Sequence, residues 1–440
     1  MIVKIRCESN KHVATKSLWG FNSVSFMLIC INFNFLFFIL CINHIYSKTI
    51  SLDELINTAR QNNPEIIAMR KKWDAVRSRI WQERTYKNPL VFVEWQKLPI
   101  DSFSLSDAEE RMFGISQMIP FPGKLSIKGK IASYDAKKTR WEYRVTELKV
   151  LSDLKINYAM YFYINKSVEI YKQTAELMNN FSKIVESKYV VGKATVGDVL
   201  RAQIEATKMS NMVLVMQQQK EIIKAKLNFL IGKKADEFIG EPEELTPKYI
   251  EISWEEIKKM VISNNPEIMK QTALLSKSKW KKNMSYTEFL PDFDLTYRYR
   301  AMDMRNDSQD FMLGFTLPLW FWRPTFNVKE MTAELQMAES EKENTELIAL
   351  YQAKEFFVKL KTAQQLIEIY RTNLLPRAEQ SLEVTEAAYR ADREDFLNLL
   401  ESVRNFLNLH LEYYKYITEY YQNLAKLERI TGVELANWSK

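Results

Sequence analysis

The sequence contains one unit twice, and this duplication constrains the fold more than any other feature. The pentapeptide Asn-Asn-Pro-Glu-Ile occupies residues 62–66 and again residues 264–268. An ordered series of matches follows at nearly the same spacing: Gly114 with Gly314, Tyr189 with Tyr389, Leu227 with Leu427 and Gly232 with Gly432. The chain therefore consists largely of two copies of a unit of about 200 residues, which is the signature of a repeat architecture.

The duplication also sets the expected boundaries. We assign the first repeat to residues 48–232 and the second to residues 253–432, with a polar, proline-containing linker at 233–252 and a C-terminal tail at 433–440. Glycine accounts for only 10 of the 440 residues, whereas average chains have roughly 7% glycine. Because glycine permits tight turns, we expect few turns and long uninterrupted elements.

Residues 1–47 have the features of a secretory signal. Basic residues between Lys4 and Lys16 precede an apolar run at residues 24–42, and the small Ser47 follows it. A basic start, an apolar stretch and a small residue at its end are typical of a cleaved leader. The alternative is a permanent N-terminal anchor. Cys30 and Cys41 follow Ile and Leu rather than the small residue of a lipoprotein signal, so no lipid anchor is expected.

Removal of this leader would limit the available chemistry. All three cysteines and two of the three histidines lie within residues 1–47, which leaves His410. A disulfide framework, a Cys–His nucleophile pair and a zinc site of clustered Cys or His are then excluded. With 62 basic and 55 acidic residues, the charge is too balanced for nucleic-acid binding. We therefore expect no cofactor, no metal site and no catalytic residues.

Two shorter helices are predicted at the start of each repeat. Ser51 and Ser253 are suitable N-caps, and each is followed three residues later by a glutamate, as in a capping box. Pro64 and Pro266 then stand in the first turn of a second helix, where the missing backbone N–H costs little. Both repeats should therefore begin with the same helix–proline–helix arrangement.

Very long helices are predicted later in each repeat. Residues 130–191 contain neither glycine nor proline. We predict helices over 124–188 and 195–231, and over 324–390 and 394–430, with a bend at Pro376. At 1.5 Å per residue the first of these would be roughly 100 Å long. Helices of this length must pack along each other or against other chains, as in coiled coils.

Two hairpins are predicted at about residues 89–119 and 291–319. Apolar and polar residues alternate from Asp292 to Arg300 and again from Phe311 to Leu319, which indicates strands with one apolar face. Strands near ten residues long whose polar face carries arginine and aspartate are typical of membrane barrels. The alternative is a half-buried hairpin on a soluble core. The residues expected to face lipid are Val91, Val93, Trp95, Phe113, Ile115, Phe293, Leu295, Tyr297, Phe311, Leu313 and Phe315.

Four strands cannot form a transmembrane barrel by themselves. Single-chain barrels begin at about eight strands, and open strand edges are not tolerated in lipid. The expected fold class is mainly α with a small β part, in which each chain supplies one third of a trimeric barrel of twelve strands. The long helices would continue this barrel as a hollow helical tube on one side of the membrane. Such an assembly would be a conduit.

These features resemble the TolC family of outer-membrane efflux proteins over about residues 51–432. The resemblance rests on the duplicated Asn-Asn-Pro-Glu-Ile, the two hairpins, Gln-Met-Ile-Pro-Phe-Pro-Gly-Lys at 117–124, the turn that begins at Tyr189, and Leu-Asn-Phe-Leu-Ile-Gly-Lys at 227–233. It implies a homotrimer in outer-membrane lipid that extends into the periplasm as a helical barrel. It also implies two partners, a periplasmic adaptor (membrane fusion) protein and an inner-membrane RND-type pump.

The resemblance has two finer features. The Phe-Pro-Gly-Lys junction at residues 121–124 is most similar to the CusC and CzcC type of heavy-metal member, and drug-efflux members have similar junctions. Asp392 departs from the family, because glycine is common at that position. The lipid-anchor cysteine of some relatives is also missing.

The resemblance places the gate and the adaptor-docking surface at the two turns between long helices. Gly192, Gly197 and Asp392 are residue types that tolerate a left-handed backbone there. For the two tyrosines, ordinary packing and a gating hydrogen bond are both open. The tip and gate candidates are Tyr189, Gly192, Asp198, Tyr389, Asp392, Glu394, Asp395 and Glu401.

The acidic residues near the second turn have two interpretations. In a trimer, inward-facing carboxylates would form rings that favour cations. Alternatively, acidic residues at helix starts stabilise the helix dipole, and we prefer this second interpretation for Glu394 and Asp395. Asp198 also stands at a helix start. Glu401 lies more than a turn further along and is the better candidate for a pore residue.

Two other side-chain groups have mainly structural interpretations. His410 lies in the middle of a predicted helix near Leu407 and Leu411, where a lone histidine is more often packed or solvated than a ligand. Trp320 and Trp322 follow the last strand and could form an aromatic girdle at the periplasmic membrane interface, or pack the strand-to-helix joint.

The function that the sequence favours is an outer-membrane exit duct of a tripartite efflux system, with heavy-metal cations as the expected substrate. A type I secretion duct or a drug-efflux duct is the alternative within this class. A soluble coiled-coil scaffold is the alternative of another class, but it predicts neither a leader nor lipid-facing strands. No enzyme is expected, because nothing places the single histidine beside a serine and an aspartate.

Overall fold

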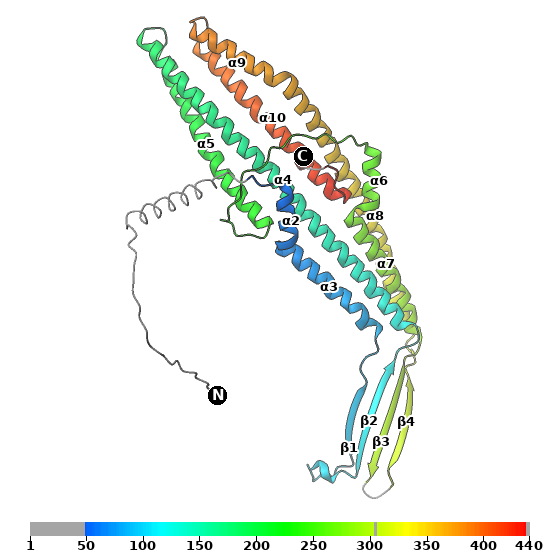
Figure 1. Ribbon diagram of the computed structural model, residues 1–440. Helices are drawn as coiled ribbons and strands as arrows, with labels where there is room; N and C mark the ends of the chain where they lie inside the picture. The colour runs from blue at the N-terminus through cyan, green and yellow to red at the C-terminus, as the bar shows by residue number, and fades with distance from the viewer. Residues whose placement is uncertain (1–48, 303–305, 437–440) are drawn as a thin grey trace, which may run out of the picture. The chain divides into compact units, whose positions relative to one another are not determined.

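The computed structural model describes residues 49–302 and 306–436 (Figure 1). The predicted leader, residues 1–47, and the end of the predicted tail, residues 437–440, lie outside the described residues. The first repeat contains α2 (Leu52–Asn62), α3 (Pro64–Arg84), β1 (Leu90–Gln96), η1 (Leu105–Asp107), β2 (Glu110–Ile119), α4 (Lys124–Val190) and α5 (Val196–Leu230). The second contains α6 (Trp254–Asn264), α7 (Pro266–Tyr286), η2 (Thr287–Phe289), β3 (Phe293–Met302), β4 (Ser308–Phe315), α8 (Trp322–Ile369), η3 (Tyr370–Leu374), α9 (Leu375–Arg390) and α10 (Phe396–Thr431).

The first helices of both repeats start as their sequences predict. The Ser51 hydroxyl accepts a hydrogen bond from the Glu54 backbone N–H, and Ser253 forms a complete capping box with Glu256. Pro64 and Pro266 stand in the first turns of α3 and α7. Local capping therefore fixes both starts, because it satisfies N–H groups that have no partner within the helix.

One buried asparagine in each repeat joins the short helices to the returning long helix. Asn63 Oδ1 accepts hydrogen bonds from the first N–H groups of α3, while its Nδ2 donates to Leu230 O at 2.8 Å. Asn265 does the same with Ile430 O at 2.8 Å. Gly232 follows with a φ of +75°, and a Cβ there would lie 2.4 Å from Asn62 O. The repeated pentapeptide thus clamps the end of α5 or α10.

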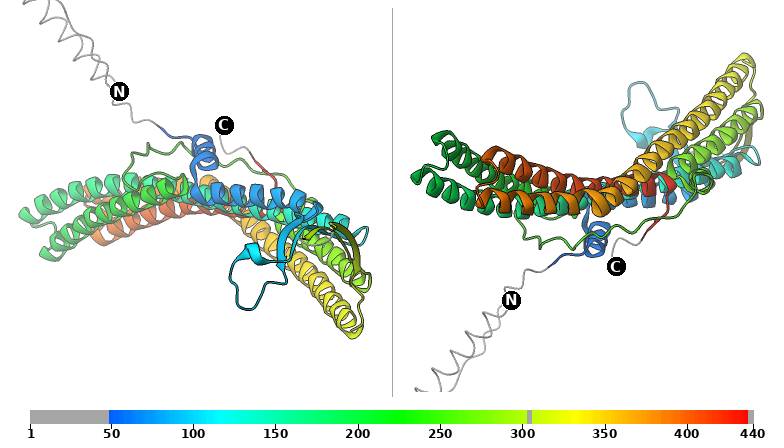
Figure 2. Two further views of the ribbon diagram at one scale, coloured as in Figure 1. Left: turned by 90° about the horizontal axis from the view of Figure 1, so that it is seen from below. Right: turned by 90° about the horizontal axis from the view of Figure 1, so that it is seen from above.

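The long helices pack side by side. Figures 1 and 2 show the α4–α5 pair beside the α9–α10 pair. At 1.5 Å per residue, the 67 residues of α4 span about 100 Å. The largest core cluster includes Tyr158 and Phe162 of α4 with Tyr420 and Leu424 of α10, so the two repeats share one core. None of the helices in the described part of the chain is both long and apolar enough to cross a membrane.

Pro376 changes the helix locally without ending it. The chain leaves α8 through the π-helical segment η3 and enters α9, where Pro376 stands in the first turn. A proline inside a helix lacks one N–H and its ring crowds the carbonyl four residues earlier. The widened π turn accommodates this defect. The sequence predicted an interruption here but not its form.

The four strands form one antiparallel sheet in the order β1-β2-β3-β4. The central pairing, β2 with β3, joins the two repeats, and Phe113 lies opposite Tyr299 in it. β4 ends at Phe315, earlier than the alternation of apolar residues suggested, so Leu317 and Leu319 lie outside the strand. Pro318 lacks a backbone N–H for the ladder, and the Leu319 N–H instead turns back to Leu317 O at 2.9 Å.

Buried tyrosines hold the inter-repeat linker against the long helices. Tyr161 of α4 donates to Gly240 O at 3.0 Å, and Tyr421 of α10 donates to Thr246 O at 2.7 Å. Tyr420 of α10 donates to Lys248 O at 2.7 Å. The linker thus gains hydrogen bonds from both repeats, although it forms no helix itself.

Candidate functional site

The sheet has one exposed apolar face, and the residues that we expected to face lipid all lie on it. Val93 is paired with Phe113, Ile115 with Tyr297, and Tyr297 with Phe311, so the same phase runs across all four strands. Phe293 and Tyr297 are half-buried, and the exposed members are Val91, Val93, Trp95, Phe113, Ile115, Leu295, Phe311, Leu313 and Phe315. Their contact with lipid stays a prediction.

The opposite face of the sheet carries paired charges. Glu110, which is buried, forms ion pairs with Lys97 and Arg300. Arg300 also contacts Asp310 at 2.8 Å, and Asp294 accepts a hydrogen bond from Ser116 at 2.9 Å. The division into an apolar and a polar face is what a strand pattern with a period of two produces.

An aromatic group lies where β4 leads into α8. Trp320, Phe321 and Trp322 are all exposed. The rings of Trp320 and Trp322 stack at 5.8 Å, and Phe321 contacts Trp322 edge to face at 5.4 Å. These three rings therefore pack against each other within the joint and are exposed at the same time. Their role as a membrane girdle stays a prediction.

The two turns between long helices have matching backbones. Gly192 has a φ of +77° and Asp392 a φ of +58°, so both use the left-handed region. Asp392 is a residue type that tolerates this conformation, whereas most side chains do not. Gly197, by contrast, lies in the first turn of α5 without a positive φ, so our expectation of a left-handed backbone there is wrong.

Two lysines of the first turn bind Asp392 of the second turn. Lys188 Nζ lies 2.5 Å from Asp392 Oδ1, and Lys193 Nζ lies 2.5 Å from Oδ2. Lys188 also donates to the Tyr389 carbonyl oxygen. Hydrogen bonds from Lys188 and Lys193 lower the pKa of Asp392 to about 2. We call this arrangement the tip clasp; sequence reasoning identified its aspartate but missed both lysines.

The two tyrosines of the tip occupy different environments. Tyr389 is 4% exposed, packs against Phe396 and lies under the Lys188 ammonium, whose Nζ is 4.2 Å from the ring centre. Burial raises the pKa of its hydroxyl, which has no hydrogen-bond partner within the described residues. Tyr189 is exposed. The structure thus brings Tyr389, and not Tyr189, into the contact between the turns.

Apart from Asp392, the acidic candidates are two helix caps, one residue that binds a side chain and one residue without a partner in the described part of the chain. Asp198 completes a capping box with Thr195, and Asp395 accepts the Asn398 backbone N–H at 2.8 Å. Glu394 accepts from the Asn398 side chain at 2.7 Å. Glu401 is exposed and forms no hydrogen bond or ion pair with any residue that the structure describes. Its place in a pore stays a prediction.

A second charged link between the repeats lies behind the tip. Glu205 of α5, 6% exposed, receives two hydrogen bonds from Arg404 of α10, at 2.8 Å from Nη2 and 3.2 Å from Nε. The hydrogen bond from Arg404 lowers the pKa of Glu205. Nothing in the sequence distinguished this glutamate from the exposed ones, because its partner comes from the other repeat.

His410 has a packed environment. Its ring lies 4.3 Å from that of Phe406, and Nε2 is 3.3 Å from Glu379 Oε1. Burial lowers the pKa of the imidazole. Within the described ranges, no group of three or more His, Cys, Asp or Glu side chains is arranged to hold a metal ion.

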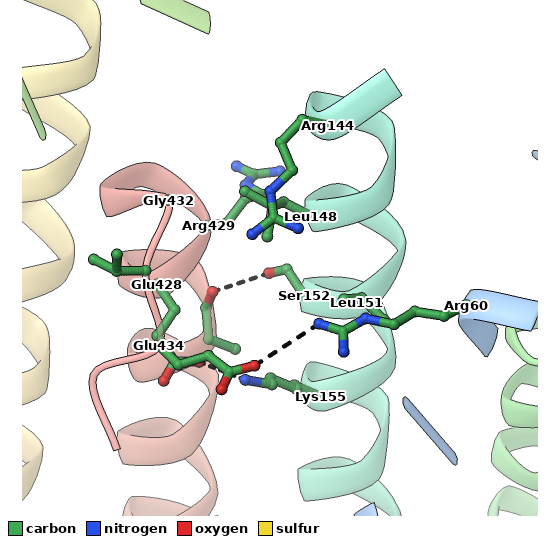
Figure 3. Close-up of a pocket in the computed structure, with 12 residues that line it drawn as sticks. Arg60, Arg144, Leu148, Leu151, Ser152, Lys155, Glu428, Arg429, Gly432 and Glu434 are labelled. Atoms are coloured by element: carbon green, nitrogen blue, oxygen red, sulfur yellow. Dashed lines mark hydrogen bonds and ion pairs between the residues drawn. The ribbon is translucent and has the colours of Figure 1, made fainter. Parts of the chain in front are cut away.

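A cavity of about 260 Å³ lies where the end of α10 meets α4 (Figure 3). Lys155 and Glu428 form a buried ion pair at 2.7 Å, and Ser152 donates to Ala425 O at 3.2 Å. Arg60 of α2 reaches Glu434 at 4.0 Å. These internal pairs connect the first repeat to the end of the second, so we interpret the cavity as part of this structural joint.

Comparison with known proteins gives a consistent result. The family model for "Outer membrane efflux protein" matches residues 55–233 and 258–433, which are most of both repeats. No curated protein is similar enough to the chain to be counted as a relative.

Several solved structures share the fold. The outer membrane protein VceC of Vibrio cholerae has a TM-score of 0.74 at 17% identity, over 88% of this chain and 97% of VceC. The CmeC outer membrane channel of Campylobacter jejuni has a TM-score of 0.75 at 16% identity, over 88% and 87% of the two chains. CusC has a TM-score of 0.75 at 14% identity, over 87% and 92%.

Proposed function

The chain belongs to the outer membrane efflux protein family, and from this premise we propose that it is the exit duct of a tripartite efflux system. Members of this family are passive channels of the outer membrane and not enzymes. The duct would receive substrate from a periplasmic adaptor and an inner-membrane RND-type pump, and the pump would supply the energy. Membership of this family excludes the alternative of a soluble coiled-coil scaffold.

The sheet is the observation that carries the proposal of a homotrimeric duct. It has one exposed apolar face and one charged face, and its outer strands β1 and β4 each pair on one side only. Unpaired strand edges are not tolerated in lipid. Three copies would pair β4 of one chain with β1 of the next and close a barrel of twelve strands, with the charged face inside.

The helices support the same assembly. In the described part of the chain, apolar side chains remain exposed on two helices at opposite edges of the molecule, Ile204, Leu214 and Ile222 on α5 and Leu347, Tyr351 and Val358 on α8. Exposed apolar surface of this extent on a soluble part of a protein usually marks an interface. Neighbouring chains on the two sides of each copy in a ring would cover both rows.

The proposed gate is the tip of the helical part. Residues that we assign to it are Tyr389, Asp392 and Lys188, with Asp198, Glu394 and Asp395 at the adjacent helix starts. Glu401 is the proposed pore residue, because three unpaired carboxylates on one level would favour cations. Tyr189 and Gly192 would belong to the surface that meets the adaptor.

Heavy-metal cations are the proposed substrate. This rests on the Phe-Pro-Gly-Lys junction at residues 121–124 and on Glu401, and both supports come from sequence. Drug efflux and type I secretion of polypeptides are the alternatives. Deletion of the gene should sensitise the source bacterium to metal salts, and complementation should restore resistance. Sensitivity to drugs alone, or loss of a secreted polypeptide, would favour the corresponding alternative.

The duct itself is tested with the purified protein. We expect it to extract from the outer-membrane fraction as a trimer and to form pores in planar bilayers. Glu401→Gln should reduce the preference of these pores for cations, whereas Glu434→Gln, far from the tip, should leave it unchanged. A monomer that needs no detergent would overturn the proposal.

A further inference from the structure

A basic hollow lies at the tip, on the side of α4 and α9. Its volume is about 420 Å³, and it is lined by Lys183, Ile184, Ser187, Lys188, Val191, Lys193, Arg390 and Asp392. Four of these side chains are cationic and one is a carboxylate. Lys183 forms no ion pair with any residue that the structure describes, and Arg390 contacts Glu386 at 2.7 Å. The hollow therefore has an excess of positive charge.

Charge is segregated across the tip. A second hollow, on the side where α5 and α10 begin, is lined by three carboxylates, Asp198, Glu394 and Asp395, and by one further cation, Arg393; it shares Lys188, Lys193 and Asp392 with the first. The tip clasp therefore separates a basic side from an acidic side. If the acidic side faces the pore, as proposed above for Glu401, the basic side faces away from it and is open to a partner.

An apolar rim borders the basic hollow. Val190 is 83% exposed and Val191 is 66% exposed, at the very end of α4. Two exposed valines beside several cations offer both apolar contact and charge, and a segment of a protein can use both. A small inorganic anion would use only the charges.

The two lysines of the tip clasp could bind another carboxylate in place of Asp392. The Asp392 side chain is 40% exposed, and its two oxygens contact the ammonium groups of Lys188 and Lys193. The Lys193–Asp392 pair is exposed, and ion pairs of this kind are weak and are screened by salt. The Lys188 side chain is only 13% exposed and is the better protected of the two lysines. A carboxylate that entered the basic hollow would meet the exposed Lys193 first and would then compete with Asp392 for Lys188, which also lines the hollow.

We propose that this hollow binds a carboxylate-rich segment of a protein partner, which competes with Asp392 for Lys188 and Lys193. The inference rests on the proposed function for the statement that the tip is the docking end. It adds that the partner surface is acidic and has apolar side chains beside its carboxylates. It also adds that docking of this partner releases the contact between the two turns.

The test measures binding of fluorescently labelled poly-L-glutamate to the full chain in nanodiscs at low salt. The variant Lys183→Gln/Arg390→Gln removes two cations of the hollow without touching the clasp. The matched control, Lys172→Gln/Arg377→Gln, removes one lysine of α4 and one arginine of α9 further from the tip, both exposed. We expect about tenfold weaker binding for the first variant and wild-type binding for the control.

Three results would overturn the proposal. The first is that the two variants bind poly-L-glutamate with equal affinity, and the second is that polyphosphate binds the wild-type protein as tightly as poly-L-glutamate does. The third is that poly-L-glutamate binds but leaves the distance between the two turns unchanged. The distance is measured between spin labels at Val190 and Arg393. Failure of the proposed function would look different, because the protein would then form no pores in bilayers under any condition.

Discussion

At the scale of single residues, the most constrained side chain of each repeat is a buried asparagine. Asn63 is 3% exposed and serves two helices, because its oxygen caps α3 and its amide donates to the carbonyl of Leu230, the last residue of α5. A side chain with both a donor and an acceptor is needed for this role, and aspartate could not donate. This explains why the pentapeptide is the clearest match between the repeats.

Asn63→Ala should destabilise the protein strongly. Loss of the cap costs about 0.5–2 kcal/mol, and a buried carbonyl left without its donor costs about 1–3 kcal/mol more. We expect a lower midpoint of thermal unfolding, followed by circular dichroism in detergent. Asn62→Ala is the control, because the Asn62 side chain is exposed and should shift the midpoint little. Equal shifts for the two variants would contradict the role of Asn63.

The tip clasp should be insensitive to moderate acid. The pKa of Asp392 is lowered to about 2, from an ordinary value near 4. A lowered pKa means that the ion pairs contribute fully above the ordinary value and are lost as the pH falls through about 2. Spin labels at Val190 and Arg393 should therefore report one distance from pH 8 to pH 5.

High salt and Asp392→Asn should each change that distance, because both weaken the ion pairs. The labels can be introduced as single pairs, since the sequence has no cysteine after Cys41. A change of distance between pH 8 and pH 5 would show that another titratable group controls the contact.

At the scale of elements, the sequence predicted what local periodicity and capping determine. The four strands, the helix starts at Ser51 and Ser253 and the long glycine-free helices follow from patterns of neighbouring residues. The sequence could not predict the clasp, the Glu205–Arg404 pair or the role of Asn63, because each joins residues that lie far apart in the chain. The π-helical segment before Pro376 was also missed, since a proline indicates a defect but not how the helix absorbs it.

The linker between the repeats is an element whose position depends on tyrosine hydroxyls. Tyr161→Phe/Tyr421→Phe removes two donors to the linker, and each hydrogen bond contributes about 1 kcal/mol. We expect faster cleavage by trypsin at Lys234 and Lys248, with little change in helix content. Tyr351→Phe, on an exposed tyrosine of α8, should leave the rate unchanged. Unchanged cleavage in the double variant would mean that packing alone holds the linker.

Two tyrosine hydroxyls give the linker a dependence on alkali. Tyr421 donates to Thr246 O, and Tyr158 accepts a hydrogen bond from the Glu243 backbone N–H at 3.0 Å. Burial raises the pKa of both hydroxyls to about 12. Because a raised pKa favours the protonated form in the folded chain, these hydrogen bonds contribute fully below the ordinary value near 10 and weaken as the pH rises through about 12. The linker should thus remain protected throughout the physiological range.

At the scale of the whole molecule, one chain leaves several surfaces incomplete. The sheet ends in β1 and β4, each paired on one side only, and apolar side chains stay exposed on its outer face and on α5 and α8. Each of these surfaces, taken alone, could be covered in several ways. A ring of identical chains would pair the free strand edges, cover the exposed apolar side chains of α5 and α8, and turn the apolar face of the sheet toward lipid. One assembly would therefore account for all of these surfaces.

The lipid-facing assignment can be tested on two adjacent residues of β1. Val93 lies on the apolar face and Glu94 on the charged face, and both are exposed. Arginine on the lipid side of a barrel costs about 2–4 kcal/mol near the middle of the membrane, and this cost would be paid in every chain of the ring. Val93→Arg should therefore reduce the assembled protein in the outer-membrane fraction.

Glu94→Arg introduces the same side chain one residue later and should assemble normally, with a change only in ion selectivity. Assembly is measured as protein that resists urea extraction from outer membranes. If both variants assembled equally well, the apolar face would not contact lipid, and the exposed side chains would have to be covered by protein instead. If only Glu94→Arg failed, the sheet would be inverted relative to the proposed barrel. The alternation of one residue thus decides the orientation of the whole assembly.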